Sequence, residues 1–162
     1  MQRMKANTET RVLAYVRHVR SAEALHQSVS RGLMVDGLTA SQFSTLKVLR
    51  IHGPLALREI AKYILKSGGN MTIVVDNLER DGLVVRDRDT EDRRIVYVSL
   101  TAKGKELFDR IYPEHLDRIR SAMGGLTDRE CEQLMDLLDK LSPQEEALAC
   151  TTVETPADCI AV

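Results

Sequence analysis

The sequence predicts a mainly α-helical protein with one small β-hairpin. Apolar residues recur at helical spacing over most of the 162 residues, whereas strand-like runs follow one another closely at 83–86 and 95–100. Between these two runs lies 87–94, a loop in which nearly every residue is charged. The expected order is three helices, a turn, a fourth helix, the hairpin and two closing helices.

Two helices are expected before the middle of the chain. Apolar positions keep helical spacing over about 10–31, with no helix breaker before Gly32, which predicts one long opening helix. Thr39 and Gln42 have the spacing of a capping box, so a second helix should begin there and run to about residue 53. A short strand at 54–56, a helix over 57–65 and a turn at 66–69 are expected to follow.

The next helix has two different faces. Met71, Val74, Val75 and Leu78 follow the spacing of a half-buried helix, which should stop at Gly82. The opposite, free face carries mostly polar residues around one apolar side chain; it consists of Gly69, Ile73, Asp76, Asn77 and Arg80, with Asn70 and Thr72 at its flanks.

This free face suits contact with a DNA groove. An exposed Ile73 covers nothing in the monomer but can contact a thymine methyl group, and Asn and Thr beside it can read base edges. Glycines in the preceding turn let the backbone approach a phosphate at a helix N-terminus. A helix docked on a core and followed by a charged hairpin is the layout of a winged helix-turn-helix, with the hairpin as the wing.

Two further helices are expected after the hairpin. Thr101 should cap the first, which contains Pro113 and should bend there before ending at 124–125. Thr127 and Glu130 form another capping box at the start of the last helix. We expect a single domain over 1–162, divided into dimerisation helices at about 10–31 and 101–147, a winged-helix part at about 39–100 and a tail at 148–162.

The flanking helices predict a homodimer. They carry more apolar surface than a winged domain of about sixty residues can cover, and a second copy of the chain would cover it. A two-fold axis between the copies would present two recognition helices to successive major grooves of a pseudo-palindromic site.

Composition narrows the classes of function. A net charge of −1 argues against a protein that coats nucleic acid indiscriminately, so DNA contacts must be local. Two Phe, four Tyr and no Trp disfavour a single-strand binder that stacks bases on aromatic side chains. With no signal-like start and no apolar run long enough to span a bilayer, we expect a cytoplasmic protein without membrane contact.

The sequence resembles the MarR family, the multiple antibiotic resistance regulators. The resemblance covers roughly 11–141, and its specific parts are GNMTIVVDNLERDGLVVRDRDTEDRR and VSLTAKG. It implies a dimeric winged-helix repressor in which an Asp and an Arg at the wing tip act together, here Asp92 with Arg94, the arginine entering the minor groove. Arg93 is then a neighbouring phosphate contact or an alternate to Arg94. Family members often have an arginine where this chain has Ile73, so a different operator is expected.

The candidate DNA-binding residues come from the turn, the recognition helix and the wing: Ser67, Gly69, Asn70, Thr72, Ile73, Asn77, Arg88, Asp92, Arg93 and Arg94. The resemblance also implies release of DNA by a small phenolic or aromatic ligand, bound in a crevice between the dimer helices and the winged part. Its candidate lining residues are Tyr15, His18, His26, Phe43 and His115.

Two alternatives stay open. Oxidation of the tail thiols Cys150 and Cys159 would make the protein a redox sensor, whereas Cys131 lies on an apolar face and should be inert. Ile73 could instead contact a partner protein, which would make this an interaction module without DNA binding. The cysteines and histidines show no metal-ligand spacing and no catalytic cluster occurs, so neither metal, cofactor nor enzymatic activity is expected.

Overall fold

The computed structural model describes residues 2–64, 68–88 and 95–141 of the chain. These residues form six helices and a three-stranded antiparallel sheet, so the predicted fold class is confirmed. In chain order the elements are α1 (Gln2–Val35), α2 (Ala40–His52), β1 (Leu55–Ala56), α3 (Leu57–Tyr63), α4 (Gly68–Arg80), β2 (Val84–Arg88), β3 (Val96–Leu100), α5 (Ala102–Met123) and α6 (Asp128–Asp139).

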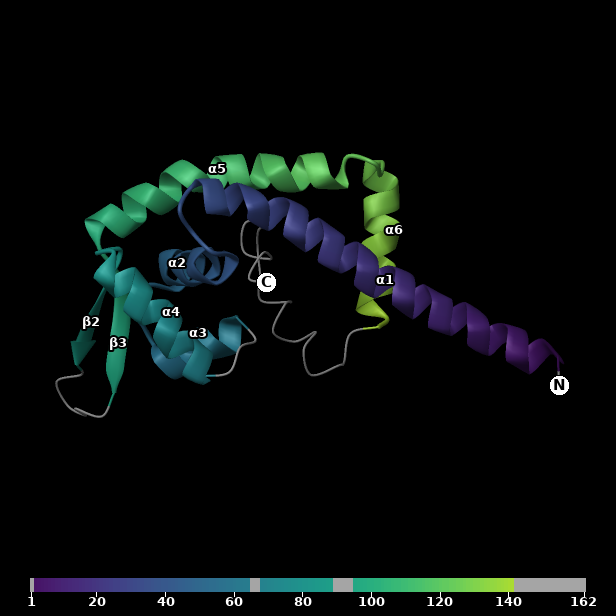
Figure 1. Cartoon of the computed structure of the whole chain (residues 1–162), viewed down its shortest axis with the longest axis horizontal. Helices are drawn as coiled ribbons and strands as arrows, with labels where there is room; N and C mark the ends of the chain where they lie inside the picture. The colour runs from purple at the N-terminus through teal and green to yellow at the C-terminus, as the bar shows by residue number, and fades with distance from the viewer. Residues whose placement is uncertain (1, 65–67, 89–94, 142–162) are drawn as a thin grey trace.

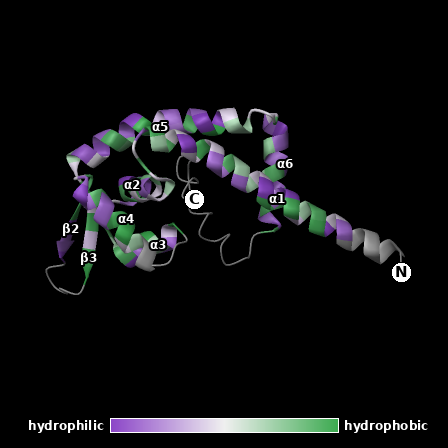
Figure 2. Ribbon diagram, viewed as in Figure 1, coloured by the Kyte–Doolittle hydropathy of each residue, from purple (hydrophilic) through white to green (hydrophobic). Residues whose placement is uncertain are grey.

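Helices α2, α3 and α4 and the sheet form a body at one end of the molecule, and α5 passes over α2 from that end (Figure 1). The N-terminal part of α1 projects away from this body, while its C-terminal part runs beside α5. Hydrophobic residues recur along the projecting part (Figure 2). Among the described residues, no helix has both the length and the apolar composition that crossing a membrane requires.

The core lies between α2, α3, α4, the sheet and α5, with Leu33 of α1 at its border. Leu46, Ile60 and Val98 are completely buried in it. The inner face of α4 contributes Met71 and Leu78, which are equally inaccessible and confirm the predicted orientation of this helix. Because the inner face is fixed by packing, the opposite face is held toward solvent.

Three helix starts are formed by the predicted local hydrogen bonds. The backbone N–H of Gln42 donates to Thr39 Oγ1, and the Gln42 side chain accepts from the Thr39 N–H at 2.8 Å. Thr127 and Glu130 make the same reciprocal pair at α6. Thr101 Oγ1 accepts from a backbone N–H in the first turn of α5, which caps that helix. The two capping boxes and the Thr101 cap are confirmed.

The hairpin pairs β2 with β3 in register from Val84–Leu100 to Arg88–Val96, and β1 joins the other edge of β3. Strand β2 starts one residue later than expected because the N–H of Leu83 donates to Leu78 O and closes the end of α4. Gly82 supplies the positive φ of +73° that this helix ending requires. The strand extends to Arg88, so its pairing includes residues that were expected in the loop.

The glycines in the sequence led to two wrong predictions of helix boundaries, at the end of α1 and at the start of α4. Helix α1 continues through Gly32 to Val35, and a Cβ at Gly32 would lie 2.4 Å from the Arg118 side chain of α5, so this glycine is part of the packing between the two helices. Gly68 and Gly69 belong to α4 and not to the preceding turn. Helix α3 ends at Tyr63, two residues earlier than expected.

Candidate nucleic-acid interface and effector cavity

The outer face of α4 is open to solvent. Ile73 is 59% exposed, Thr72 is exposed and Asn77 is half-buried, which confirms the expected position of Ile73 outside the core. Because Ile73 is not part of the core, it gives α4 an exposed apolar side chain that is suited to contact with another molecule. Two polar neighbours on the same helix supply hydrogen-bonding groups beside it.

The wing begins directly beside α4. The described part of the wing ends at Arg88, which is exposed and pairs with Val96 across the hairpin. Ser67, Asp92, Arg93 and Arg94 lie outside the described residues, and so does the side chain of Asn70. The predicted contacts at these positions, and at Gly69 in the first turn of α4, stay predictions.

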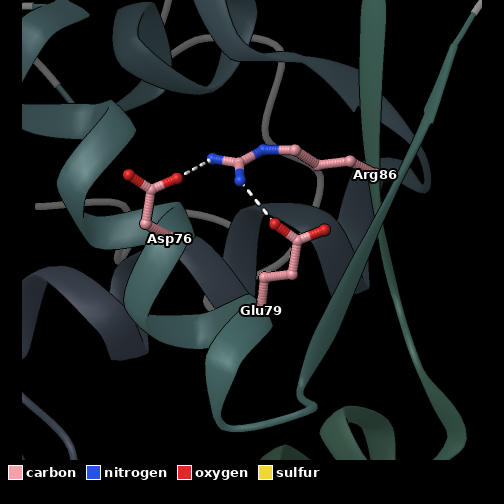
Figure 3. Close-up of polar contacts among 3 residues, drawn as sticks. All are labelled: Asp76, Glu79 and Arg86. Atoms are coloured by element: carbon pink, nitrogen blue, oxygen red, sulfur yellow. Dashed lines mark hydrogen bonds and ion pairs between the residues drawn. The ribbon is translucent and has the colours of Figure 1, made fainter.

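Arg86 of β2 bridges two carboxylates of α4 (Figure 3). Its Nη1 lies 2.5 Å from Glu79 Oε2 and its Nη2 lies 2.6 Å from Asp76 Oδ1. Sequence reasoning placed Asp76 on the free face and did not pair Arg86 with either acid. The sequence feature that could have indicated this bridge is a pair of acidic residues one helical turn apart, followed by an arginine in the next strand.

A cavity of about 180 Å³ lies between α1, α2 and α5. Its wall is mainly apolar, with four polar side chains, and consists of Leu25, His26, Val29, Ser30, Leu33, Ala40, Phe43, Ser44, His115, Ile119, Ala122 and Met123. The structure therefore brings together three of the five candidate effector residues. Tyr15, which is 69% exposed, and His18 lie nearer the N-terminus of α1 and do not line the cavity.

His115 is, with Ser44, one of the two buried polar residues of this wall. The residue is 6% exposed, its ring centroid lies 4.3 Å from that of Phe43, and its buried Nδ1 has no hydrogen-bond partner among the described residues. Burial lowers the pKa of His115 to about 4, helped by the positive charges of Arg118 and Lys47 and opposed by Asp36. The imidazole is therefore neutral near pH 7 and presents an unpaired nitrogen.

The buried histidine should make the fold acid-sensitive. The folded chain binds fewer protons at His115 than the unfolded chain between about pH 4 and pH 6.5, so stability is lost as pH falls through that window. Urea denaturation at pH 7, 6, 5 and 4 should show a smaller loss for His115→Gln than for the wild type. His18→Gln, at an exposed histidine of α1, is the control and should follow the wild type. Equal pH dependence of His115→Gln and wild type would contradict this expectation.

No group of three potential metal ligands occurs among the described residues. Cys131 is half-buried on α6 and is not bonded to another cysteine of the described residues. Cys150 and Cys159 lie outside those residues, so the redox alternative stays a prediction.

The two-helix unit α3–α4, the hairpin beside it and the exposed face of α4 define a winged helix-turn-helix DNA-binding protein. A profile described as the MarR family matches residues 38–96. The chain is 40% identical over 121 residues to YkoM of Bacillus subtilis, an uncharacterized HTH-type transcriptional regulator, covering 75% of this chain and 79% of the relative. The protein belongs to the MarR family, whose members are transcriptional regulators and not enzymes.

Solved structures agree with this assignment. Sco3205 of Streptomyces coelicolor, a MarR family transcriptional regulator in complex with DNA, is similar with a TM-score of 0.75 at 26% identity, covering 82% of this chain and 88% of that one. BpsR of Bordetella bronchiseptica, whose DNA binding is regulated by 6-hydroxynicotinic acid, is similar with a TM-score of 0.71 at 28% identity, covering 78% and 91% of the two chains. The sequence resemblance to the MarR family is thus confirmed.

Proposed function

We propose that this protein is a homodimeric transcriptional repressor that binds a pseudo-palindromic operator and is released by a small phenolic or aromatic ligand. The observation that carries the proposal is the solvent-facing side of α4, with Ile73 exposed at its centre and the wing hairpin beside it. In this arrangement α4 enters the major groove and the wing reaches the adjacent minor groove. The likeness to the DNA complex of Sco3205 supports it.

The dimer is supported by apolar surface that the monomer leaves open. On α1 the exposed side chains include Val12, Leu13 and Tyr15. On and after α6 they include Leu137 and Leu141, and no described residue of α6 is buried. The proposed division is dimerisation helices at about 10–31 and 101–147, a DNA-binding part at about 39–100 and a tail at 148–162.

The cavity supports control by a small molecule. Its volume is suited to a compound with one aromatic ring, its wall is mainly apolar, and His115 in this wall has an Nδ1 without a hydrogen-bond partner among the described residues. The regulation of BpsR by 6-hydroxynicotinic acid, a one-ring aromatic acid, is consistent with a ligand of this size. Aromatic compounds of this kind are the proposed effectors.

The test of DNA binding is a titration of the purified protein against its own promoter DNA and against random duplex of equal length. We expect a clear preference for the promoter, an affinity that falls as salt rises, and two chains per duplex by light scattering. A protein that shows no salt-dependent preference, or that binds as a monomer, would contradict the proposal. Failure of duplex DNA to compete with a bound protein partner would favour the interaction-module alternative.

A separate prediction concerns Arg94, at the expected tip of the wing. Arg94→Ala should weaken operator binding by about 1–3 kcal/mol without unfolding the dimer, because a cation in the narrow, negative minor groove is removed. Fluorescence anisotropy measures the affinity and circular dichroism measures the folding. Arg129→Ala, at an exposed arginine of α6, is the control and should bind DNA as the wild type does. Unchanged affinity of Arg94→Ala would remove this arginine from the mechanism.

The effector is tested with salicylate, 4-hydroxybenzoate and hydroquinone as probes. At least one should release the wild-type protein from promoter DNA and raise its melting temperature. Ala122→Leu adds bulk to the cavity wall and should lower the response to that probe while preserving DNA binding in its absence. An identical response of Ala122→Leu and wild type would place the effector elsewhere.

A further inference from the structure

We propose that Arg86 is a positioning residue for DNA binding: its bridge to Asp76 and Glu79 holds the wing at a fixed place relative to the recognition helix α4. This inference rests on the proposed DNA-binding function. It assigns to Arg86 no contact with DNA; the residue acts through the two elements that it connects.

The geometry of the bridge fixes two distances at once. The two terminal nitrogens of one planar guanidinium bind two different carboxylates, at 2.5 Å to Glu79 and 2.6 Å to Asp76. The acids lie one turn apart on α4, as Figure 3 shows. A lysine ammonium lacks this fork and cannot impose the same planar arrangement.

The strand end of the bridge is firmly anchored. Arg86 is the central residue of β2 and pairs with Val98, which is completely buried in the core. The Arg86 side chain is 21% exposed, less than either of its partners. Solvent and salt weaken the attraction in an ion pair less when the guanidinium is partly shielded from water than when both groups are fully exposed.

The helix end of the bridge lies beside the proposed reading surface. Asp76 is one turn from Ile73 on α4, so the residue that receives Arg86 is a neighbour of the residue expected to contact bases. Two residues beyond Arg86, β2 reaches Arg88 at the end of its described part. The bridge therefore lies between the α4 surface and the outer wing, where it sets the distance between their DNA contacts.

Arg86→Met tests this role, since it keeps the length of the side chain and removes the charge and the fork. The probe is a duplex that the wild-type dimer selects from a random-sequence library. Arg86→Met should bind it about tenfold more weakly, with less change for unselected duplex. The slope of log affinity against log salt should also fall by about one, as a wing phosphate contact is lost. A purely structural role would leave this slope unchanged.

Arg50→Met is the matched control. Arg50 of α2 makes an exposed bridge with Asp109 of α5, at 3.0 Å, which joins neither α4 nor the hairpin. It should leave both affinity and salt slope at the wild-type values. Equal losses in Arg50→Met and Arg86→Met would show that loss of any such bridge weakens binding and would overturn the proposal.

Two more variants separate positioning from charge. Arg86→Lys retains the positive charge and should recover only part of the affinity; full recovery would overturn the need for the fork. In the triple variant Asp76→Asn, Glu79→Gln, Arg86→Met, neither carboxylate of the bridge is left unpaired to repel phosphate. Binding should stay weak if Arg86 positions the wing, and wild-type binding would overturn the proposal. A wild-type protein that selects no duplex would overturn both this inference and the proposed function, whereas wild-type behaviour of Arg86→Met overturns this inference alone.

Discussion

Replacing Leu78 by alanine should lower the free energy of unfolding by about 2–5 kcal/mol. Leu78 is completely buried, and it is fixed from two sides: its side chain belongs to the core and its carbonyl accepts the N–H of Leu83 at the end of α4. The smaller side chain removes buried apolar contacts and leaves a cavity beneath the recognition helix. Urea denaturation followed by circular dichroism measures the loss.

Ile73→Ala is the matched control on the same helix. Because Ile73 is 59% exposed, its replacement should change stability by no more than about 0.5 kcal/mol. Its effect should instead appear in affinity for the selected duplex, and should be lost when the contacted thymine is replaced by uracil, which lacks the methyl group. Similar stability losses for Leu78→Ala and Ile73→Ala would contradict the assignment of inner and outer faces.

Gly104→Ala should destabilise the folded chain by about 3 kcal/mol, at the upper end of the range for overpacking. A Cβ at this position would lie 2.0 Å from Leu83 O, a backbone atom that cannot move away like the end of a side chain. That carbonyl also accepts the N–H of Thr101, so the start of the wing and the start of α5 are joined here. Thermal denaturation should show a correspondingly lower melting temperature.

The control for this change is Gly125→Ala, between α5 and α6. A Cβ there would meet no atom within 4 Å, and Gly125 does not have the positive φ that disfavours other residues. We expect its stability to stay within about 0.5 kcal/mol of the wild type. If the two glycine variants were equally destabilised, the close approach at Gly104 would not be the cause.

The sequence predicted those features whose cause is local. Thr39 and Thr127 cap helices because their partners lie three residues away, and α4 could be oriented from its own apolar spacing. Gly82 was read correctly as a helix end. Gly32 has the same identity but a different role, because it lies inside α1 against the side chain of Arg118, far along the chain.

The site was predictable in part for the same reason. The exposure of Ile73 follows from helical periodicity alone. The two ion pairs of Arg86 depend on how strand β2 lies against helix α4, and the apolar spacing within each element does not predict this. The cavity joins three helices, and sequence spacing did not show where along the 34 residues of α1 the contacts with α2 and α5 stop. Tyr15 and His18 therefore entered the candidate set together with His26.

Helix α2 is in contact with both the cavity and the recognition helix. Phe43 and Ser44 line the cavity, while the next residue, Thr45, has its Oγ1 3.7 Å from Met71 Sδ of α4. A ligand and a duplex would thus act on opposite sides of one helix. Thermodynamic linkage then fixes a quantitative relation: an effector that weakens operator binding tenfold must itself bind the operator-bound dimer tenfold less tightly than the free dimer. The fraction of the protein that is bound to an operator would in this way set the effective sensitivity of the regulator to its own signal.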